Sequence, residues 1–183
     1  MTSREEQIAL AVDRLDTRDA DQLDAAWAEL RPLGYGVVPY LLAAYPRFRT
    51  WQGRTALAYY ATRYARISAD AVQLGLLALT DKSYMVRYRA CGLLAYALDS
   101  DALIALDRVA RHDPREMVAH SALAAMNAIK AGNHNLFADR SLSGRTSWSV
   151  NPGDAPVGAP TPPLPSRLQR MRLGIMAVPP SSG

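Results

Sequence analysis

The chain contains an internal repeat of 32 residues, and this repeat limits its fold more than any other feature. Residues 81–100, DKSYMVRYRACGLLAYALDS, fall on residues 113–132, DPREMVAHSALAAMNAIKAG. The shared positions are mostly apolar or small and lie three or four residues apart, the spacing of one buried helix face. Such a repeat predicts pairs of helices that bury a core by stacking on neighbouring pairs. Over the whole unit the identical pairs are Ser68/Ser100, Leu74/Leu106, Ala78/Ala110, Asp81/Asp113, Met85/Met117, Val86/Val118 and Ala90/Ala122.

Each unit carries signals for the ends of its two helices. Ser68 and Ser100 are good N-caps for a first helix. Asp81 and Asp113 lie in the turn before the second helix. Pro114 would occupy the first position of that second helix, where its missing N–H group has no helical partner to lose. The sequence therefore predicts a helix, a turn and a second helix in each unit.

Further helix pairs precede these two units. A less regular copy begins near residue 36, and its Arg54 falls on Arg87 at an offset of 33 residues. Residues 1–34 predict two more helices, and their acidic outer face is typical of a cap at the end of a stack. We therefore predict an N-terminal capping helix pair over residues 1–34 and three repeats over residues 35–132.

The C-terminal part of the chain departs from the helical period. Residues 145–150 follow a polar SLSG turn and are enriched in Thr, Trp and Val, so residues 133–151 predict a short β-hairpin. An isolated hairpin is marginal in water, and Phe137 and Trp148 should therefore pack on the end of the last helix pair. Residues 152–183 hold eight of the twelve prolines, and we predict a disordered tail there.

The repeat consists of an apolar helix, a turn Asp and then Val-Arg-x-x-Ala-x-x-x-Leu, which resembles the motif of the HEAT and HEAT-like repeat family. The third unit has Ala119 where the motif has Arg, and the first unit has no Asp in its turn. The resemblance covers residues 36–131. It implies an all-α fold, a short right-handed α-solenoid whose second helices line a concave surface, but it says almost nothing about function. The middle unit carries the motif at Asp81, Val86, Arg87, Ala90 and Leu94.

Composition limits the class of protein. Cys91 is the single cysteine, so no intramolecular disulfide framework can form. No apolar run approaches the ~18 residues of a membrane span, and the first residues, MTSREEQIALAVDRLD, lack the basic start and apolar stretch of a signal peptide. A length of 183 residues fits one domain and a tail. We therefore expect a soluble, cytoplasmic protein with no membrane span.

The net charge of +4 is unevenly distributed. Residues 1–34 carry four arginines against eight acidic residues, and residues 35–132 carry twelve basic against seven acidic residues. A basic surface fits nucleic acid or an acidic protein partner. However, 19 of the 21 basic residues are Arg, an excess that a GC-rich genome would also produce. Charge alone leaves these explanations open.

No constellation for catalysis or metal binding stands out. His112, His120 and His134 have no metal-ligand spacing on a shared helix face and no cysteine partner at a short spacing. Cys91 falls at a helix position where a small buried residue is expected. The glycines of LRPLGYGVV lack the Lys and the Ser or Thr of a phosphate-binding loop. We predict that the protein is not an enzyme and holds no cofactor or metal.

The most informative polar and aromatic residues lie on the second helices, outside their core faces. Trp, Tyr and Arg are the residue types enriched at binding hot spots. For any single tyrosine, packing between neighbouring repeats is the competing explanation. We predict a partner-binding surface formed by Trp51, Thr55, Tyr59 and Arg63 in the first unit, Tyr84, Tyr88, Arg89 and Tyr96 in the second, and Glu116, His120 and Asn127 in the third.

The resemblance leaves three functions to weigh. Small bacterial HEAT-like proteins with a C-terminal hairpin include immunity proteins, so a noncatalytic protein-binding module, with a toxin as one partner, is the leading hypothesis. The second is nucleic-acid binding, with the HEAT-like DNA glycosylases as its enzymatic extreme. Arg54, Arg63 and Arg87 would then contribute to a basic groove, which Glu116 interrupts. The third, a lyase-type HEAT protein that handles bilin pigments, rests on repeat similarity alone.

Overall fold

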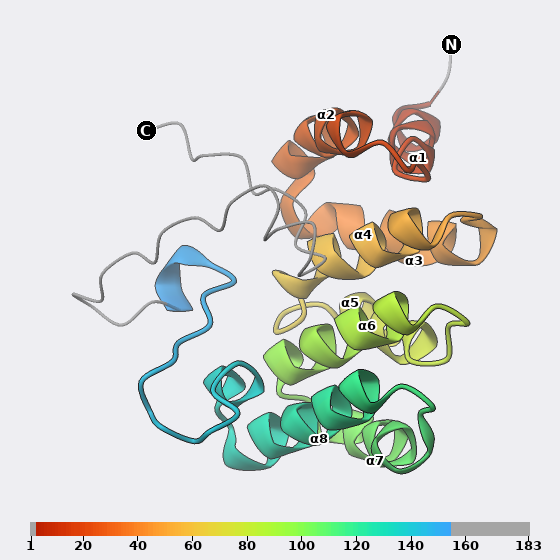
Figure 1. Ribbon diagram of the computed structural model, residues 1–183. Helices are drawn as coiled ribbons and strands as arrows, with labels where there is room; N and C mark the ends of the chain where they lie inside the picture. Colours follow the sequence, from red (N-terminus) through yellow and green to blue (C-terminus); the bar gives the residue numbers. More distant parts are fainter. Residues whose placement is uncertain (1–2, 155–183) are drawn as a thin grey trace.

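The computed structural model describes residues 3–154, which are largely helical and include no strand (Figure 1). The all-α prediction is therefore confirmed for this part of the chain. The α-helices are α1 (Arg4–Asp13), α2 (Ala20–Leu30), α3 (Val38–Ala44), α4 (Trp51–Thr62), α5 (Ala69–Ala78), α6 (Tyr84–Ala97), α7 (Leu103–His112) and α8 (Glu116–Ala131). The short 3-10 helices are η1 (Arg31–Val37), η2 (Tyr45–Arg47), η3 (Ser100–Ala102), η4 (His134–Phe137) and η5 (Pro152–Asp154).

From α3 onward the helices form two layers (Figure 1). The second helix of each pair, α4, α6 or α8, lies in the front layer, and α6 packs between α4 and α8. The first helices α3, α5 and α7 lie behind, and α5 packs on both α3 and α6. The N-terminal pair, α1 and α2, lies at one end of this row, where α1 packs on α3. Each pair therefore buries apolar surface against its neighbour as well as within itself.

The buried core is densest around α6, which contacts α4, α5 and α8. Val86, Ala90, Leu93 and Leu94 of this helix are fully buried. Gly75 permits the close approach of α5, because a Cβ atom at this position would lie 2.7 Å from Cδ2 of Leu93. The absence of a side chain at Gly75 thus lets α5 and α6 pack closely.

Two bidentate ion pairs join successive units, and we call them the Arg–Asp ladder. Arg54 of α4 donates from Nε and Nη2 to the two carboxylate oxygens of Asp81, at 2.5 and 3.1 Å. Arg87 of α6 donates in the same way to Asp113, at 2.6 and 3.0 Å. None of the four side chains is more than 12% exposed. Each arginine therefore reaches out of its own unit to the turn of the following unit.

Additional hydrogen bonds satisfy the first of these buried pairs. Arg54 donates from Nη1 to the carbonyl oxygen of Phe48 at 3.1 Å. Asp81 accepts from the Tyr45 hydroxyl at 2.6 Å and from the Ser83 amide at 2.8 Å. Burial alone would raise the pKa of Asp81, but hydrogen bonds from Arg54, Tyr45 and Ser83 outweigh it and hold the pKa below its ordinary value. The carboxylate therefore stays ionised inside the fold.

The ladder explains both departures from the repeat motif. An Asp in the turn is needed only where a preceding unit supplies an Arg, and an Arg only where a following unit supplies an Asp. The first unit has Phe48 where the second has Asp81, and the third has Ala119 where the second has Arg87. A guanidinium buried without a carboxylate would be strongly destabilising. The irregular positions therefore mark the two ends of the ladder.

A different contact attaches the N-terminal pair. Asp16, in the turn between α1 and α2, accepts from the amides of Arg49 and Thr50 at 2.8 and 2.9 Å. It also accepts from the Thr50 hydroxyl at 2.6 Å, and the same hydroxyl accepts from the Gly53 amide at the start of α4. One carboxylate thus fixes the loop that caps α4 to the preceding pair.

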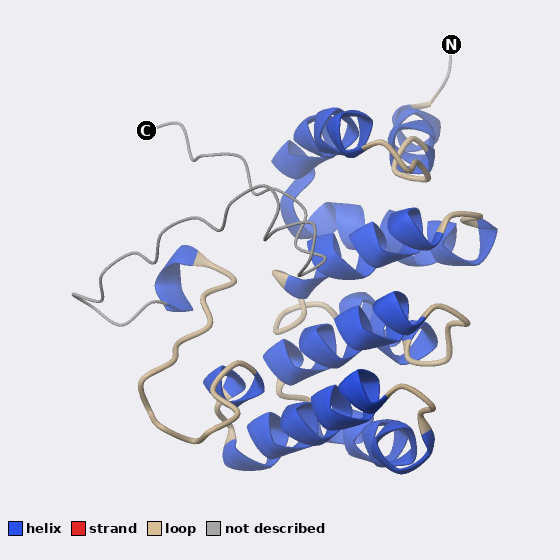
Figure 2. Cartoon of the chain, in the orientation of Figure 1, coloured by secondary structure: helices blue, strands red, loops and turns tan. Residues whose placement is uncertain are grey.

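The predicted β-hairpin over residues 133–151 is wrong, because this segment is a 3-10 helix followed by an irregular loop (Figure 2). Asp139 accepts from the amides of Ser143 and Gly144 at 3.2 and 2.6 Å, and the Trp148 amide donates to Asn135 Oδ1 at 2.8 Å. Side-chain oxygens thus take N–H groups that a partner strand would have bound. Of the predicted tail, residues 152–154 form η5, and the rest lies outside the described residues.

We expect Asp81→Asn to lower the free energy of unfolding by about 3 kcal/mol, because it leaves the buried guanidinium of Arg54 without a carboxylate. Urea denaturation followed by circular dichroism measures the loss. Asp107→Asn is the matched control, since Asp107 pairs with Arg111 on an exposed face of α7 and such pairs contribute about 0.5 kcal/mol. Equal losses in the two variants would contradict a structural role for the ladder.

Candidate functional site

The front layer presents one surface, which we call the second-helix face and define as the exposed and half-buried side chains of α4, α6 and α8. The strap, defined as residues 133–154, covers part of it. This segment leaves the end of α8, packs against α6 and reaches the C-terminal end of α4 (Figure 1). The face is thereby divided into a part beneath the strap and a part beyond it, toward the N-terminal ends of the helices.

Aromatic rings form the apolar side of the strap. A Cβ atom on Gly92 of α6 would lie 3.3 Å from Cε1 of Phe137 and 3.8 Å from Cη2 of Trp148. The Trp148 ring lies 5.9 Å from the Tyr96 ring, edge to face. The two strap rings thus reach past the last helix pair, where the sequence placed them, and occupy the space that Gly92 leaves open on α6.

A carboxylate forms the polar end of the strap. Asp154 accepts from the Tyr96 hydroxyl at 2.9 Å, and from the amides of Val150 and Asn151 at 3.1 and 2.7 Å. Its other oxygen lies 3.4 Å from Arg66 Nη1. Hydrogen bonds from Asn151, Tyr96 and Val150 outweigh the effect of burial and lower the pKa of Asp154. The end of the strap is therefore held as an anion against α6 and the turn after α4.

His134 links this anionic end to the rest of the strap. Its Nδ1 lies 2.7 Å from Arg66 Nη2, and its Nε2 lies 2.8 Å from the carbonyl oxygen of Trp148. Because the carbonyl can only accept and the guanidinium can only donate, the ring is neutral with its proton on Nε2. Burial lowers the pKa of His134 below its ordinary value of 6.5, and the charge of Arg66 lowers it further.

We expect the free energy of unfolding to fall as the pH drops from 7 to 5.5. The unfolded chain protonates His134 in this window while the folded chain resists protonation, so stability present above pH 6.5 is lost below it. The slope contributed by this ring is at most about 1.4 kcal/mol per pH unit. His134→Gln should flatten the slope in urea titrations relative to the unsubstituted protein. An unchanged slope in His134→Gln would contradict the assignment.

Two of the predicted partner-binding residues are not available on the surface. Tyr96 is 2% exposed, because the strap covers its ring and Asp154 accepts from its hydroxyl. Thr55 is 4% exposed, and its hydroxyl donates to the carbonyl oxygen of Trp51 at 2.7 Å. Both therefore act within the fold, and we remove them from the candidate site.

The part of the face beyond the strap carries the remaining aromatic residues. Trp51 and Tyr84 stand at the first positions of α4 and α6 and are 43% and 41% exposed. Tyr59 and Tyr88 are half-buried, and the guanidinium of Arg89 lies over both rings, 5.2 and 5.9 Å from their centres. The structure thus brings together Tyr59, Tyr88 and Arg89 from two helices, while Trp51 and Tyr84 stand at the N-terminal ends of the same helices.

The other predicted residues lie elsewhere on the second helices. Arg63, at the C-cap of α4, is half-buried, and its carbonyl oxygen accepts from Asn151 Nδ2 of the strap. Glu116, His120 and Asn127 are exposed along α8. His120 Nε2 lies 3.8 Å from a Glu116 carboxylate oxygen, an exposed contact one helical turn apart.

The predicted partner-binding residues include Arg89 but leave out two other arginines that neighbour aromatic rings. Arg115, just before α8, is exposed, and its guanidinium lies 5.2 Å from the centre of the Tyr84 ring. Arg66 lies 4.2 Å from the centre of the Tyr96 ring. The position of Arg115 beside the predicted Glu116 was a usable signal. The pairing of Arg66 with Asp154 spans 88 residues, and no local pattern indicates it.

The described residues offer little that could carry chemistry. Cys91 is fully buried, and burial raises the pKa of its thiol to about 12. Within residues 3–154 there is no group of three or more His, Cys, Asp or Glu side chains placed to hold a metal ion. The same residues contain no helix that is long and apolar enough to cross a bilayer.

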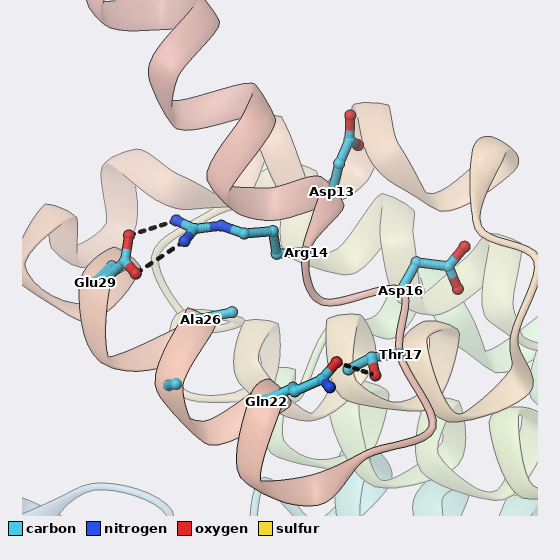
Figure 3. Close-up of a pocket in the computed structure, with 8 residues that line it drawn as sticks. Asp13, Arg14, Asp16, Thr17, Gln22, Ala26 and Glu29 are labelled. Atoms are coloured by element: carbon cyan, nitrogen blue, oxygen red, sulfur yellow. Dashed lines mark hydrogen bonds and ion pairs between the residues drawn. The ribbon is translucent and has the colours of Figure 1, made fainter.

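A polar cleft lies between α1 and α2, and its charged groups are engaged in contacts within the protein (Figure 3). Arg14 donates to Glu29 across the cleft, and the Thr17 hydroxyl donates to Gln22. Asp16 accepts hydrogen bonds from the loop before α4. The polar groups of the cleft therefore hold parts of the protein together, and the second-helix face remains the stronger candidate site.

Comparison of the chain with protein-family models, with curated proteins and with solved structures finds no match. Its function is therefore inferred from the geometry described above.

Proposed function

We propose that the protein is a noncatalytic protein-binding module that holds its partner on the second-helix face. The observation that carries this proposal is the set of aromatic side chains on α4 and α6: exposed Trp51 and Tyr84 at their first positions, and half-buried Tyr59 and Tyr88 beside Arg89. Tryptophan, tyrosine and arginine are the residue types enriched at interaction hot spots. Their helices are buried on the opposite side, so these side chains are held by a rigid support rather than by a loop.

We further propose that the scaffold is a HEAT-like α-solenoid. The two-layer stacking of α3 to α8 and the buried ladder between successive units support this assignment. In a stack of this kind each unit contacts only its neighbours, and the row of second helices forms an extended surface. Such a surface suits a partner that lies across several units.

The positions of the arginines favour a protein partner over nucleic acid. The basic groove considered from the sequence included Arg54 and Arg87, but the carboxylates of Asp81 and Asp113 bind both guanidinium groups inside the fold. Neither arginine can then neutralise a phosphate, and nucleic-acid affinity depends on such neutralisation. A toxin partner stays a prediction from the repeat resemblance, and the hairpin that belonged to that resemblance does not occur within residues 3–154.

We expect Trp51→Ala to weaken partner binding by about 1–4 kcal/mol while helicity stays unchanged, because Trp51 is 43% exposed and is not part of the buried core. A photo-crosslinking amino acid at position 51 should capture a discrete protein in cells. The same amino acid at position 104 is the control, because Ile104 is 80% exposed on α7 of the other layer. Titrations of the captured protein against Trp51→Ala and Ile104→Ala then measure the loss.

Two outcomes would contradict the proposed function. The first is equal capture at positions 51 and 104, which would show no preference for the second-helix face. The second is submicromolar binding of a generic DNA duplex that weakens by orders of magnitude between about 50 and 200 mM salt, as release of counterions requires. Fluorescence anisotropy with a labelled duplex measures it.

A further inference from the structure

His134 holds the strap against two elements of the helix stack. Its side chain is 8% exposed, and its ring lies edge to face with the Tyr96 ring of α6 at 5.3 Å. Nε2 donates to the carbonyl oxygen of Trp148 at 2.8 Å, within the strap. Nδ1 accepts from Nη2 of Arg66, in the turn after α4, at 2.7 Å. One imidazole therefore connects the far part of the strap to the helices beneath it.

The guanidinium of Arg66 is held in place opposite this ring. Its Nε donates to the carbonyl oxygen of Tyr96 at 3.1 Å, and its Nη1 lies 3.4 Å from a carboxylate oxygen of Asp154. The guanidinium carbon also lies 4.2 Å from the centre of the Tyr96 ring. A guanidinium keeps its charge throughout the pH range in which proteins fold. Arg66 therefore places a fixed positive charge opposite Nδ1 of His134.

Only a neutral imidazole fits this position. A proton on Nδ1 would remove the acceptor of the ring and turn an N–H group toward an N–H group of Arg66. Two positive charges would then face each other across a contact of 2.7 Å. The hydrogen bond from Nε2 to Trp148 would survive, because that nitrogen already carries its proton. The repulsion therefore acts between the strap and the turn after α4, rather than within the strap.

Asp154 opposes this effect, because its negative charge favours a proton on His134, and the hydrogen bond to the carbonyl of Trp148 acts in the same direction. The oxygens of Asp154 already accept from the Tyr96 hydroxyl and from two strap amides. Burial and the charge of Arg66 outweigh both contributions, so the pKa of His134 in the closed strap lies below 6.5. Tyr96 faces the ring from α6 and stays neutral, because burial raises the pKa of its hydroxyl. The closed strap therefore disfavours the imidazolium.

The contacts that align the helix stack keep their charges in the same pH range. Burial opposes it, but hydrogen bonds from Arg54 and Arg87 hold the pKa values of Asp81 and Asp113 below their ordinary value. The ladder therefore stays ionised in mildly acidic solution. The strap lies over one side of this stack, and opening it breaks none of the ladder contacts. Local opening of the strap is thus compatible with a folded stack.

We propose that the strap is a pH-sensitive cover of the second-helix face and that it separates from α6 when His134 takes up a proton. Opening moves the ring away from Arg66 and gives the imidazolium access to water. It also uncovers Gly92 and Tyr96, which the Trp148 ring approaches in the closed strap. The exposed part of the second-helix face is therefore larger in mildly acidic solution. The proposal concerns only the strap and the helices beneath it, so it does not depend on the proposed function.

Proton linkage gives the expected size of the effect. In the open strap the imidazole of His134 binds a proton near its ordinary pKa of 6.5, and in the closed strap it does so only at lower pH. The closed strap is therefore fully stable above pH 6.5 and loses stability as the pH falls below it. From about pH 7.5 to about pH 5.5, the equilibrium constant for opening should rise about threefold to tenfold, with the upper limit set by uptake of one proton.

Native-state hydrogen exchange of the full-length protein, followed by NMR, measures this constant. Dividing each rate by the intrinsic exchange rate at the same pH gives a protection factor. We expect the protection factors of the Trp148 and Asn151 amides, which are hydrogen-bonded within the strap, to fall about threefold to tenfold over this pH range. They should be insensitive to about 1 M urea, because local opening exposes little surface, whereas the buried Leu94 of α6 should lose protection with urea.

Two histidine variants assign the effect. Glutamine offers a donor and an acceptor but takes up no proton, so His134→Gln should abolish the pH dependence of the strap amides. His112→Gln is the matched control and should keep that dependence, because His112 is exposed at the end of α7 in the other layer. If the strap of His134→Gln is unprotected at both pH values, the imidazole of the unsubstituted protein decides. Its NMR signals should titrate below pH 6.5.

The opposite results would overturn the proposal. Strap amides whose protection does not change with pH would show that closure is not linked to a proton. Equal sensitivity of the Trp148 and Leu94 amides to urea would show that the strap opens only when the stack unfolds. A pH dependence that persists in His134→Gln, or titration of the His134 ring at or above pH 6.5, would exclude this imidazole as the group that controls the strap.

Discussion

The Arg–Asp ladder is the contact on which the register of the helix pairs depends. Each guanidinium binds a carboxylate of the next unit through both oxygens, so sliding or rotating one unit against the next breaks two hydrogen bonds at once. A buried ion pair stabilises a fold only when further hydrogen bonds offset its desolvation. Here Tyr45, the Ser83 amide and the carbonyl of Phe48 supply them for the first rung. The apolar contacts between helices stabilise the stack, and the ladder fixes how each helix pair is aligned with the next.

The ladder also determines which charges reach the surface. It buries Arg54 and Arg87 together with the carboxylates of Asp81 and Asp113, so the arginines of the repeat motif add little to the charge of the second-helix face. The arginines that remain there come from positions outside the repeat motif, such as Arg115. A protein can therefore have a basic composition without presenting a continuous basic groove, because position and pairing decide what a partner meets.

The strap is a second, weaker level of organisation laid over the stacked helices. Its fold depends on side chains that take backbone N–H groups, on aromatic packing over Gly92 and on one anionic end. These contacts link its stability to pH through His134, whereas the ladder involves no group that titrates near neutrality. Strap and helix stack are thus expected to respond differently to the same solution conditions.

The sequence by itself determined the helical fold of the described residues, the helix pairs, and the positions of Trp51 and Tyr84, because hydrophobic period, caps and repeat spacing are local properties. It also showed both gaps in the motif, at Phe48 and Ala119. Only the tertiary structure explained those gaps. It also showed that Tyr96 and Thr55 are buried and that the predicted hairpin is an irregular strap. The physical reason is distance along the chain: Asp154 meets Arg66 across 88 residues and Arg54 meets Asp81 across 27, and no local pattern encodes such pairings.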